Sequence, residues 1–490
     1  MAASFIHIVC RYAAQYLEAN KETLKEHSRF HKWKPTTTDE IQAFLALLLA
    51  MGLLEQIEIH EYWTTNCVTQ TPFFPSVMSR DRFLLILTFL HFNDNNNFIP
   101  RGQPNYDPLY KLGDTYHHII DSFPANYYPS KNIAIDEGLI PWRGNLHFRV
   151  YNPDKPEKFG LKSFELCDEL GYVCQYELYT GRREDISNRG STYDIVMRLI
   201  RKYLDTGHHL YCDNYYTSIT LFNHLYKKKT LACGTMRLHR KNIPPRFKDE
   251  KLAKGNFFVM NNDPVTIMKY NDKRVVSLCS TIHKGEMIPT GRVSRATGEA
   301  VEKLDCVCDY NKFMGAVDRS DQMITYLCMR RKTMKWYKKV MFHMFDLCEL
   351  QAYLLYKYNT EKPVIHRFFR RELIEQLIKS ADLPKPVKAG KPSTSGAVLQ
   401  RIQPGHFPDI KLDNNGVKLS KRCVLCTEAM RKILTDKGMK VPARPGHNTT
   451  YCCPDCDHVS LCITPCFRFW HTYRDYIGAY KKYVEDKDLL

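Results

Sequence analysis

Three aspartates of this chain stand where metal-dependent phosphoryl transfer would need them. Asp136 and Asp213 each end a short β-like run, and Asp318 opens a helix-like stretch. Carboxylates carried by two strand ends and a helix can converge on one point, where hard divalent cations bind oxygen ligands. Asp321 follows Asp318 by one helical turn and therefore lies on the same face. The pattern favours a two-metal site that acts on nucleic-acid strands.

Spacing alone leaves other acidic residues open. Aspartate is common at strand ends, turns and helix starts, so each member of the trio also fits a cap or a solvated charge. Composition does not exclude the neighbouring acids, which are Glu165, Asp168, Glu169 and Asp185.

The C-terminal cysteines form the strongest local motif. Two Cys-x2-Cys pairs are followed by further cysteines and a histidine. Thiolates at this spacing reach one zinc ion, and a second pair or a histidine completes a tetrahedral shell. Seven ligands exceed one site, which predicts two interleaved Zn²⁺ ions. The expected ligands are Cys423, Cys426, Cys453, Cys456, Cys462, Cys466 and His471, with His447 or Cys452 as an eighth.

Basic residues and aromatic rings gather between residues 328 and 341, where there is no acidic residue. Such segments give salt-dependent contacts to phosphates, and their rings can stack on bases. The alternative is a solvated helix face with the tryptophan in the core. The candidate DNA contacts are Arg330, Arg331, Lys332, Lys335, Trp336, Lys338 and Lys339.

The composition favours a polyanionic partner. Among 490 residues the formal net charge is +18, which points to nucleic acid before a membrane surface. The most apolar stretch, residues 41–54, is short for a membrane span, and the first residues lack a signal-peptide pattern. We therefore expect the 18 cysteines to be reduced or bound to metal.

Several types of element must position these residues. Apolar residues at helical spacing and a cap at Ser79 predict helices in the first 130 residues. Strand-like runs on either side of Glu169-Leu170-Gly171 predict a hairpin, and a helix is expected from Thr217 or Ser218. The expected segments are a helical region (1–130 and 330–382), a catalytic core (131–236 and 305–329), a β-rich insertion (237–304), a linker (383–420), a zinc domain (421–476) and a tail (477–490).

Sequence blocks along nearly the whole chain resemble the piggyBac family of DNA transposases. IDEGLIPWRG, KPEKFGLK, CDNYYTS, GTMR…RKNIP, MGAVDRSDQM and RRKTMKWYKK occur in the family's order, and YCCPDCDHVSLCITPCFRFWHT also fits. The resemblance implies an α/β fold with an RNase H-like catalytic core and an all-β insertion. A helical dimerisation and DNA-binding region and a C-terminal zinc-binding cysteine-rich domain would flank this core.

The resemblance also implies roles for the residues. Asp136, Asp213 and Asp318 would be catalytic, would bind Mg²⁺ or Mn²⁺ together with Asp321, and would lie near Trp336. The implied reaction nicks transposon ends, forms and resolves hairpins, and joins 3′-OH ends to TTAA target DNA. The expected partners are double-stranded DNA with terminal inverted repeats and a second copy of the chain, in the nucleus, with no membrane or small-molecule substrate. The alternative is a domesticated DNA-binding or chromatin-interaction protein that no longer cleaves.

Overall fold

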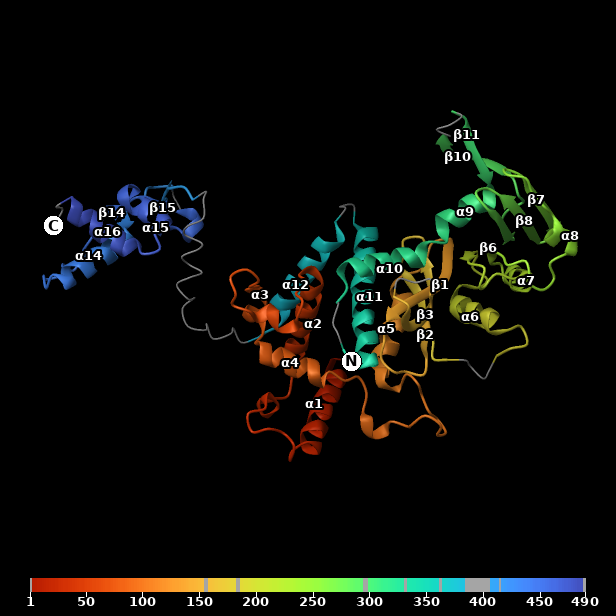
Figure 1. The fold of residues 1–490 in the computed structure, drawn as a ribbon, viewed down its shortest axis with the longest axis horizontal. Helices are drawn as coiled ribbons and strands as arrows, with labels where there is room; N and C mark the ends of the chain where they lie inside the picture. The colour runs from red at the N-terminus through yellow and green to blue at the C-terminus, as the bar shows by residue number, and fades with distance from the viewer. Residues whose placement is uncertain are drawn as a thin grey trace. The chain divides into compact units, whose positions relative to one another are not determined.

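The chain folds into two compact units in a computed structural model. The model describes residues 2–153, 157–181, 186–293, 298–329, 333–360, 364–383, 406–413 and 416–487. The N-terminal unit joins Met1–Thr64 to Gln70–Pro384, and the C-terminal unit joins Thr65–Thr69 to Lys385–Leu490. Figure 1 labels the elements of each unit.

A nine-stranded mixed sheet lies at the centre of the N-terminal unit. Its order is β2-β3-β1-β5-β6-β9-β8-β7, and β4 also pairs with β3. The β1–β5 and β5–β6 pairs are parallel, and the remaining pairs are antiparallel. The strands are β1 (Asn132–Pro141), β2 (Arg149–Tyr151), β3 (Phe159–Asp168), β4 (Val173–Leu178), β5 (His209–Cys212), β6 (Leu231–Thr235), β7 (Phe257–Asn262), β8 (Val265–Asn271) and β9 (Val275–Ser280).

The predicted hairpin is present as β3–β4. The Asp168 side chain accepts hydrogen bonds from the backbone N–H groups of Leu170 and Tyr172, which closes the turn. Gly171 has a φ of +88°, a conformation that glycine adopts without steric cost.

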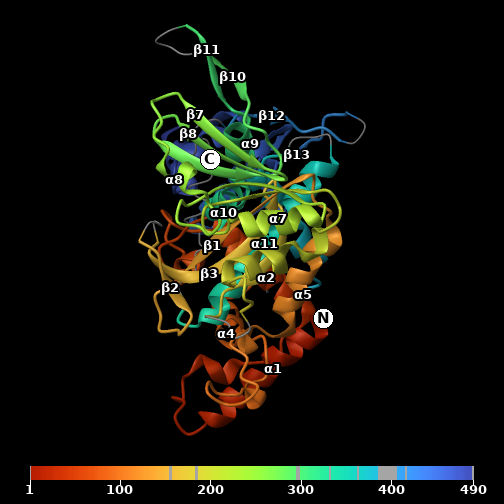
Figure 2. The ribbon, with the colours of Figure 1, turned by 90° about the vertical axis from the view of Figure 1, so that its right-hand side faces the viewer.

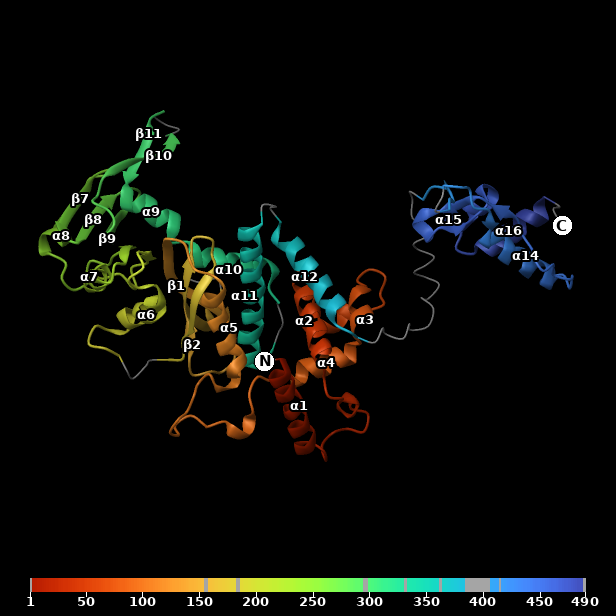
Figure 3. The ribbon, with the colours of Figure 1, turned by 180° about the vertical axis from the view of Figure 1, so that it is seen from behind.

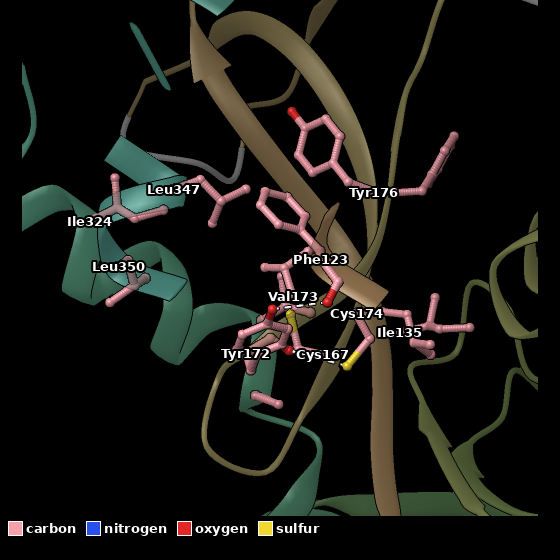
Figure 4. Packing of buried hydrophobic residues seen from close by; sticks show 14 of the residues in the cluster. Phe123, Ile135, Cys167, Tyr172, Val173, Cys174, Tyr176, Ile324, Leu347 and Leu350 are labelled. Atoms are coloured by element: carbon pink, nitrogen blue, oxygen red, sulfur yellow. Dashed lines mark hydrogen bonds between the residues drawn. The ribbon is translucent and has the colours of Figure 1, made fainter. Parts of the chain in front are cut away.

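Helices cover both faces of the sheet (Figure 1). On one face lie α5 (Gly113–Asn126), α10 (Ala316–Leu327) and α11 (Trp336–Asn359). On the other lie α6 (Ser191–Ile200) and α7 (Ile219–Lys227), the second of which begins after Ser218 as expected. Figure 4 shows the first interface, where Ile324 of α10 and Leu347 of α11 approach the side of the sheet that carries Cys167 and Val173.

Helix α9 (Asp305–Phe313) contacts β1, β6 and β9 and leads into α10. A further group of helices in the N-terminal unit comes from both ends of its sequence. They are α1 (Ala2–Ala19), α2 (Thr38–Leu53), α3 (Phe73–Val77), α4 (Arg80–Phe89) and α12 (His366–Ser380). Ser79 caps α4 as predicted, and Thr37 with Glu40 forms a capping box at the start of α2. Although more than 300 residues separate them in the sequence, α2 and α12 pack side by side (Figure 3). Among the described residues no helix has the length and apolar character needed to span a bilayer.

Segment 237–304 differs from the expected all-β insertion. Strands β7, β8 and β9 continue the main sheet, because β9 pairs with β6. The segment also contains a helix, α8 (Pro245–Asp249), because a proline at the first helical position is already set for helical φ. A separate two-stranded ribbon, β10 (Met287–Val293) with β11 (Ala300–Leu304), stands apart from the sheet (Figure 2).

The C-terminal unit is small and starts earlier than the sequence suggested. Its elements are β12 (Asp409–Ile410), β13 (Lys421–Arg422), α14 (Val424–Asp436), β14 (Asn448–Thr449), β15 (Tyr451–Cys453), β16 (Val459–Ser460), α15 (Arg468–Thr472) and α16 (Tyr476–Asp486). Strand β12 lies in the expected linker 383–420, yet it pairs with β15. Helix α16 lies in the expected tail 477–490, yet Tyr480 and Val484 join the core beneath α14. A small core needs these flanking segments because it has little apolar surface to bury.

Candidate active site and metal centre

The sheet brings two of the three aspartates together. In the parallel β1–β5 pair, Ile135 lies opposite Cys212. Asp136 and Asp213 each follow one of these residues, so the two carboxyl groups leave neighbouring strands at the same level. The two residues therefore come together as expected, but only Asp213 follows the end of its strand. Asp136 lies within β1, which continues to Pro141 because it pairs with β3 beyond this point.

Burial raises the pKa values of Asp136 and Asp213. It raises the pKa of Asp136 to about 8, and the nearby carboxyl groups of Glu137 and Asp213 add to the rise. Burial also raises the pKa of Asp213, again with a contribution from Glu137. A divalent cation bound between the two acids would favour their ionised forms, because its charge would offset the repulsion between the carboxylates. The oxygen donors of Asp136 and Asp213 therefore fit a hard metal ion such as Mg²⁺ or Mn²⁺.

The turn after β5 is held by several local bonds. The backbone N–H of Tyr215 donates to Asp213 Oδ1 over 2.8 Å, and Thr217 Oγ1 donates to the Asp213 carbonyl over 2.8 Å. Arg237 Nε donates to Asn214 Oδ1 over 2.7 Å, and Arg240 donates to the Asn214 carbonyl over 3.0 Å. No local sequence pattern places Arg237 and Arg240 beside the residue that follows Asp213.

The third aspartate is on a helix that packs on the sheet, but the three aspartates do not form a close group of ligands. Helix α10 packs on β1 and β3. Asp318 is exposed in its first turn, whereas Asp321 is half-buried and adds to the raised pKa values of Cys167 and Tyr176, which are due mainly to burial. Among the described residues, only two groups of three or more potential ligands have their ligand atoms within 4.8 Å of one another, and neither contains an aspartate. Asp318 therefore lies on the expected helix, but Asp136, Asp213 and Asp318 do not together form a group with all ligand atoms within 4.8 Å.

Two of the alternative acids, Asp168 and Glu165, occupy structural positions. Asp168 is buried and accepts a 2.6 Å hydrogen bond from Tyr127 in addition to its turn contacts. Glu165 is buried opposite Asp136 in the β1–β3 pair and accepts a 2.6 Å hydrogen bond from Ser163. Glu169 is half-buried at the hairpin turn, and Asp185 lies outside the described residues.

The C-terminal unit contains both groups of clustered ligand atoms. Cys423, Cys426, Cys462 and Cys466 form the first. The backbone N–H of Cys462 donates to Cys423 Sγ over 3.3 Å, and that of His447 donates to Cys426 Sγ over 3.2 Å. Four sulfur ligands with such bonds fit a structural zinc ion.

The second group contains a ligand that the sequence analysis missed. His406, Cys453, Cys456 and His471 form this group. His406 Nδ1 lies 3.5 Å from Cys453 Sγ and 3.3 Å from Cys456 Sγ, and His471 Nε2 lies 3.5 Å from Cys456 Sγ. The Phe467 carbonyl lies 2.7 Å from His471 Nδ1, which leaves Nε2 for a metal. Two sulfur and two nitrogen ligands also fit zinc.

Neither of the two residues proposed as an eighth ligand belongs to a group. His447 takes part through its backbone: its N–H donates to Cys426 Sγ, and its carbonyl accepts from the Cys423 N–H over 2.9 Å. Cys452 precedes Cys453 in β15, so its side chain points to the opposite face of the strand and lies 3.9 Å from His458. Seven ligands left a second four-ligand site one short, which was a reason to look for a histidine upstream of Cys423.

The structure divides the predicted DNA contacts. Lys335 is exposed and Lys339 is half-buried. Lys338 is buried, and its Nζ donates to the carbonyls of Leu87 and Thr88 over 2.7 and 2.9 Å, so it caps α4 rather than facing DNA. Trp336 packs edge-on against Phe148 at 5.4 Å between ring centroids. Arg330, Arg331 and Lys332 lie outside the described residues.

Comparison with known proteins identifies relatives of the chain. A family model described as Transposase IS4 matches residues 4–353. Human PiggyBac transposable element-derived protein 3 is 26% identical over 377 residues, covering 73% of this chain and 61% of that protein. Human PiggyBac transposable element-derived protein 2 is 25% identical over 340 residues, covering 66% of this chain and 56% of that protein. The chain thus spans less than two thirds of either relative.

A solved structure has the same fold. The piggyBac transposase in a synaptic complex with hairpin DNA, determined by cryo-electron microscopy, aligns with a TM-score of 0.69 and 24% sequence identity. The alignment covers 85% of each chain.

Proposed function

The chain belongs to the piggyBac transposase family, and from this premise we propose that it is a cut-and-paste DNA transposase. It would nick transposon ends, form and resolve hairpins, and join 3′-OH ends to TTAA target DNA. The observation that carries the proposal is the pair Asp136 and Asp213, which leave parallel neighbouring strands with raised pKa values. Acids placed in this way are suited to bind divalent cations.

The acidic residues have separate roles in this proposal. Asp136 and Asp213 would hold Mg²⁺ or Mn²⁺, and Asp318 with Asp321 would complete the site from α10, which packs on β1 and β3. When bound, the metal supplies Lewis-acid stabilisation and an activated nucleophile. Strands β4, β3, β1, β5 and β6, with helices on both faces, support an RNase H-like core for this chemistry. Segment 237–304 would be the insertion in that core.

DNA would be bound by both units. The C-terminal unit would use its two zinc sites to hold a basic surface against the terminal inverted repeats. In the N-terminal unit, Lys335 and Lys339 remain available for phosphate contacts. The related piggyBac structure was solved with hairpin DNA, which supports DNA as the partner here. We expect the chain to act as a homodimer in the nucleus.

The proposal is tested by replacing each acid in turn. Asp136→Asn, Asp213→Asn and Asp318→Asn should each slow cleavage of a duplex carrying the element's ends by on the order of 10³-fold or more, because each removes charge that holds the metal. Affinity for the duplex should change little. Asp205→Asn, at a carboxylate whose side chain is 53% exposed, is the matched control. Cleavage at the wild-type rate by any of the three variants would contradict the assignment.

The second candidate is a domesticated relative that binds DNA or chromatin without cutting it. Two observations favour it: the relatives are named transposable element-derived proteins, and the exposed Asp318 does not form a close ligand group with Asp136 and Asp213. If the wild-type protein binds an end-containing duplex but leaves it intact in Mg²⁺ and in Mn²⁺, the second candidate replaces the first.

A further inference from the structure

One arginine joins four helices in the interior of the N-terminal unit. Arg370 of α12 is fully buried. Its guanidinium donates to Asp346 Oδ1 over 3.2 Å, to Glu349 Oε2 over 2.6 Å and to the carbonyl of Leu327. Asp346 and Glu349 belong to α11, and Leu327 is the last residue of α10. The fourth helix, α2, contributes close contact at Gly52.

Both carboxylates make further bonds that fix this arrangement. Asp346 Oδ2 accepts a 2.8 Å hydrogen bond from the backbone N–H of Met329, just beyond α10. Glu349 lies 3.0 Å from His366 Nε2, and the His366 ring stacks on Tyr353. The end of α10 is therefore bound to α11 at two points. The Leu327 carbonyl is linked through Arg370, and the Met329 N–H bonds directly to Asp346.

Gly52 shows how closely α2 approaches the same point. A Cβ at this position would lie 2.1 Å from the Leu327 oxygen and 2.6 Å from Arg370 Nη1. Such distances are far inside van der Waals contact, so any other residue would displace the α10 terminus or the guanidinium. The α10 terminus is thus enclosed by α2, α11 and α12.

Stability alone is a weak explanation for this network. A buried ion cluster commonly contributes no more to folding than apolar residues of similar volume, because its charges lose their hydration. In some proteins such a cluster instead selects one arrangement of the elements around it. Here the selected element is α10, the helix that carries Asp318 and Asp321.

We propose that Arg370, held by Asp346 and Glu349, is a positioning residue for the acidic face of α10. By binding the Leu327 carbonyl it fixes the end of a rigid helix, and Asp321 lies ~9 Å back along that helix at 1.5 Å per residue. A shift of the terminus therefore moves Asp318 and Asp321 relative to Asp136 on β1. The inference rests on the proposed function, because the placement of these acids has a consequence for activity only if the chain binds a catalytic metal.

The test compares Arg370→Met with Arg371→Met in the full chain. Arg371 is the next residue of α12, and its side chain is 69% exposed in a surface pair with Glu375, which makes it a matched control. The readout is single-turnover cleavage of an end-containing duplex as a function of Mn²⁺ concentration. We expect the half-saturating Mn²⁺ concentration of Arg370→Met to rise by about ten-fold or more, as for other residues that orient ligands. Affinity for DNA should stay within about two-fold, and Arg371→Met should match the wild type.

A merely structural role predicts a different result. It would lower the folded fraction, and with it the amplitude of cleavage, at an unchanged Mn²⁺ midpoint; this outcome overturns the inference. If Arg370→Met does not fold, Arg370→Lys decides. Lysine keeps the positive charge, but its single ammonium group replaces a planar guanidinium that binds three oxygens. Arg370→Lys should therefore raise the half-saturating Mn²⁺ concentration by a smaller factor. An unchanged value contradicts the proposal.

Hydrogen exchange separates this inference from the proposed function. If the wild-type protein cleaves no duplex, the proposed function fails, but the amides of α10 still report on the network. They should exchange faster in Arg370→Met, or in Arg370→Lys if the methionine variant does not fold, than in the wild type and in Arg371→Met. Equal exchange in all variants overturns the positioning role whether or not the wild type cleaves.

Discussion

The two candidate metal regions of this protein differ in how closely the fold gathers their ligands. In the C-terminal unit, both groups of four cysteine and histidine ligands have their ligand atoms within 4.8 Å of one another. In the N-terminal unit, Asp136 and Asp213 lie side by side, while Asp318 is exposed on α10. The difference follows from sequence distance. Each zinc group contains one Cys-x2-Cys pair that needs only one turn of chain, although its other two ligands lie elsewhere in the sequence. The acidic site has no such local pair, and it depends on how a distant helix packs on the sheet.

The same difference separates the two kinds of metal role. A structural zinc site stabilises the fold that surrounds it, so its ligands are expected to be closely gathered. A catalytic site keeps positions open for water and substrate. In the proposed site, the last ligands would come from α10, the helix whose end Arg370 binds. The comparison therefore predicts that metal loss acts on folding in one unit and on chemistry in the other.

Removal of zinc should produce the largest effect. A chelator should unfold the C-terminal unit, because structural zinc supplies about 10 kcal/mol or more of folding free energy in small domains. The N-terminal unit should stay folded, since its large core contains no zinc group among its described residues. Limited proteolysis of the full chain with mass spectrometry measures both. If the C-terminal unit resists proteolysis in excess chelator, zinc does not hold its fold, and the two units do not differ in this way.

Replacement of single ligands should give a smaller and more specific effect. Cys453→Ser should reduce the bound zinc from two ions to about one, because Cys453 belongs to the second ligand group. The adjacent Cys452→Ser should keep both ions, since that side chain points to the other face of β15. Native mass spectrometry counts the ions, and His406→Ala should behave like Cys453→Ser. A loss of zinc in Cys452→Ser would mean that the assignment of ligands is wrong.

The smallest effect concerns Lys338, which the basic segment predicted to be a DNA contact. Burial lowers the pKa of Lys338 from 10.5 to about 8. The folded state then releases its proton before the unfolded state does, so this residue reduces stability below about pH 8, and the loss is recovered as pH rises to 10.5. The unfolding free energy of the wild type should therefore rise over that interval relative to Lys338→Met, by on the order of 1–3 kcal/mol. Denaturant titrations at several pH values measure this, with Lys335→Met, at an exposed site, as the control that keeps the wild-type slope.

The features that the sequence could predict are those that depend on residues close together in the chain. The Ser79 cap, the β3–β4 hairpin and the paired cysteines depend on neighbouring residues, and all are present. His406 was missed because it lies far from the other ligands in a proline-rich stretch that resembled a linker. The burial of Lys338 depends on α4, some 250 residues away in sequence. The joining of β9 to β6 likewise depends on a long-range pairing that no local pattern encodes.

The acidic trio shows both cases in one site. Asp136 and Asp213 could be paired from sequence because each follows a short apolar run, and these two runs lie in register in parallel neighbouring strands. The prediction that Asp136 ends its strand was wrong, because β1 continues to Pro141. The placement of Asp318 depends on contacts at the opposite end of α10, where Arg370 binds the Leu327 carbonyl. The sequence identified the helix, and only tertiary packing decides which of its faces meets the sheet.

Metal-dependent cleavage by the full chain tests the central claim most directly. The substrate is a duplex that carries the element's terminal repeat beside TTAA, labelled at one end, and the products are separated on a denaturing gel with and without Mg²⁺. The account predicts a nick at the transposon end, followed by a hairpin that migrates as one joined strand, only when the metal is present. Binding of the duplex with neither product, in Mg²⁺ or Mn²⁺, would contradict it.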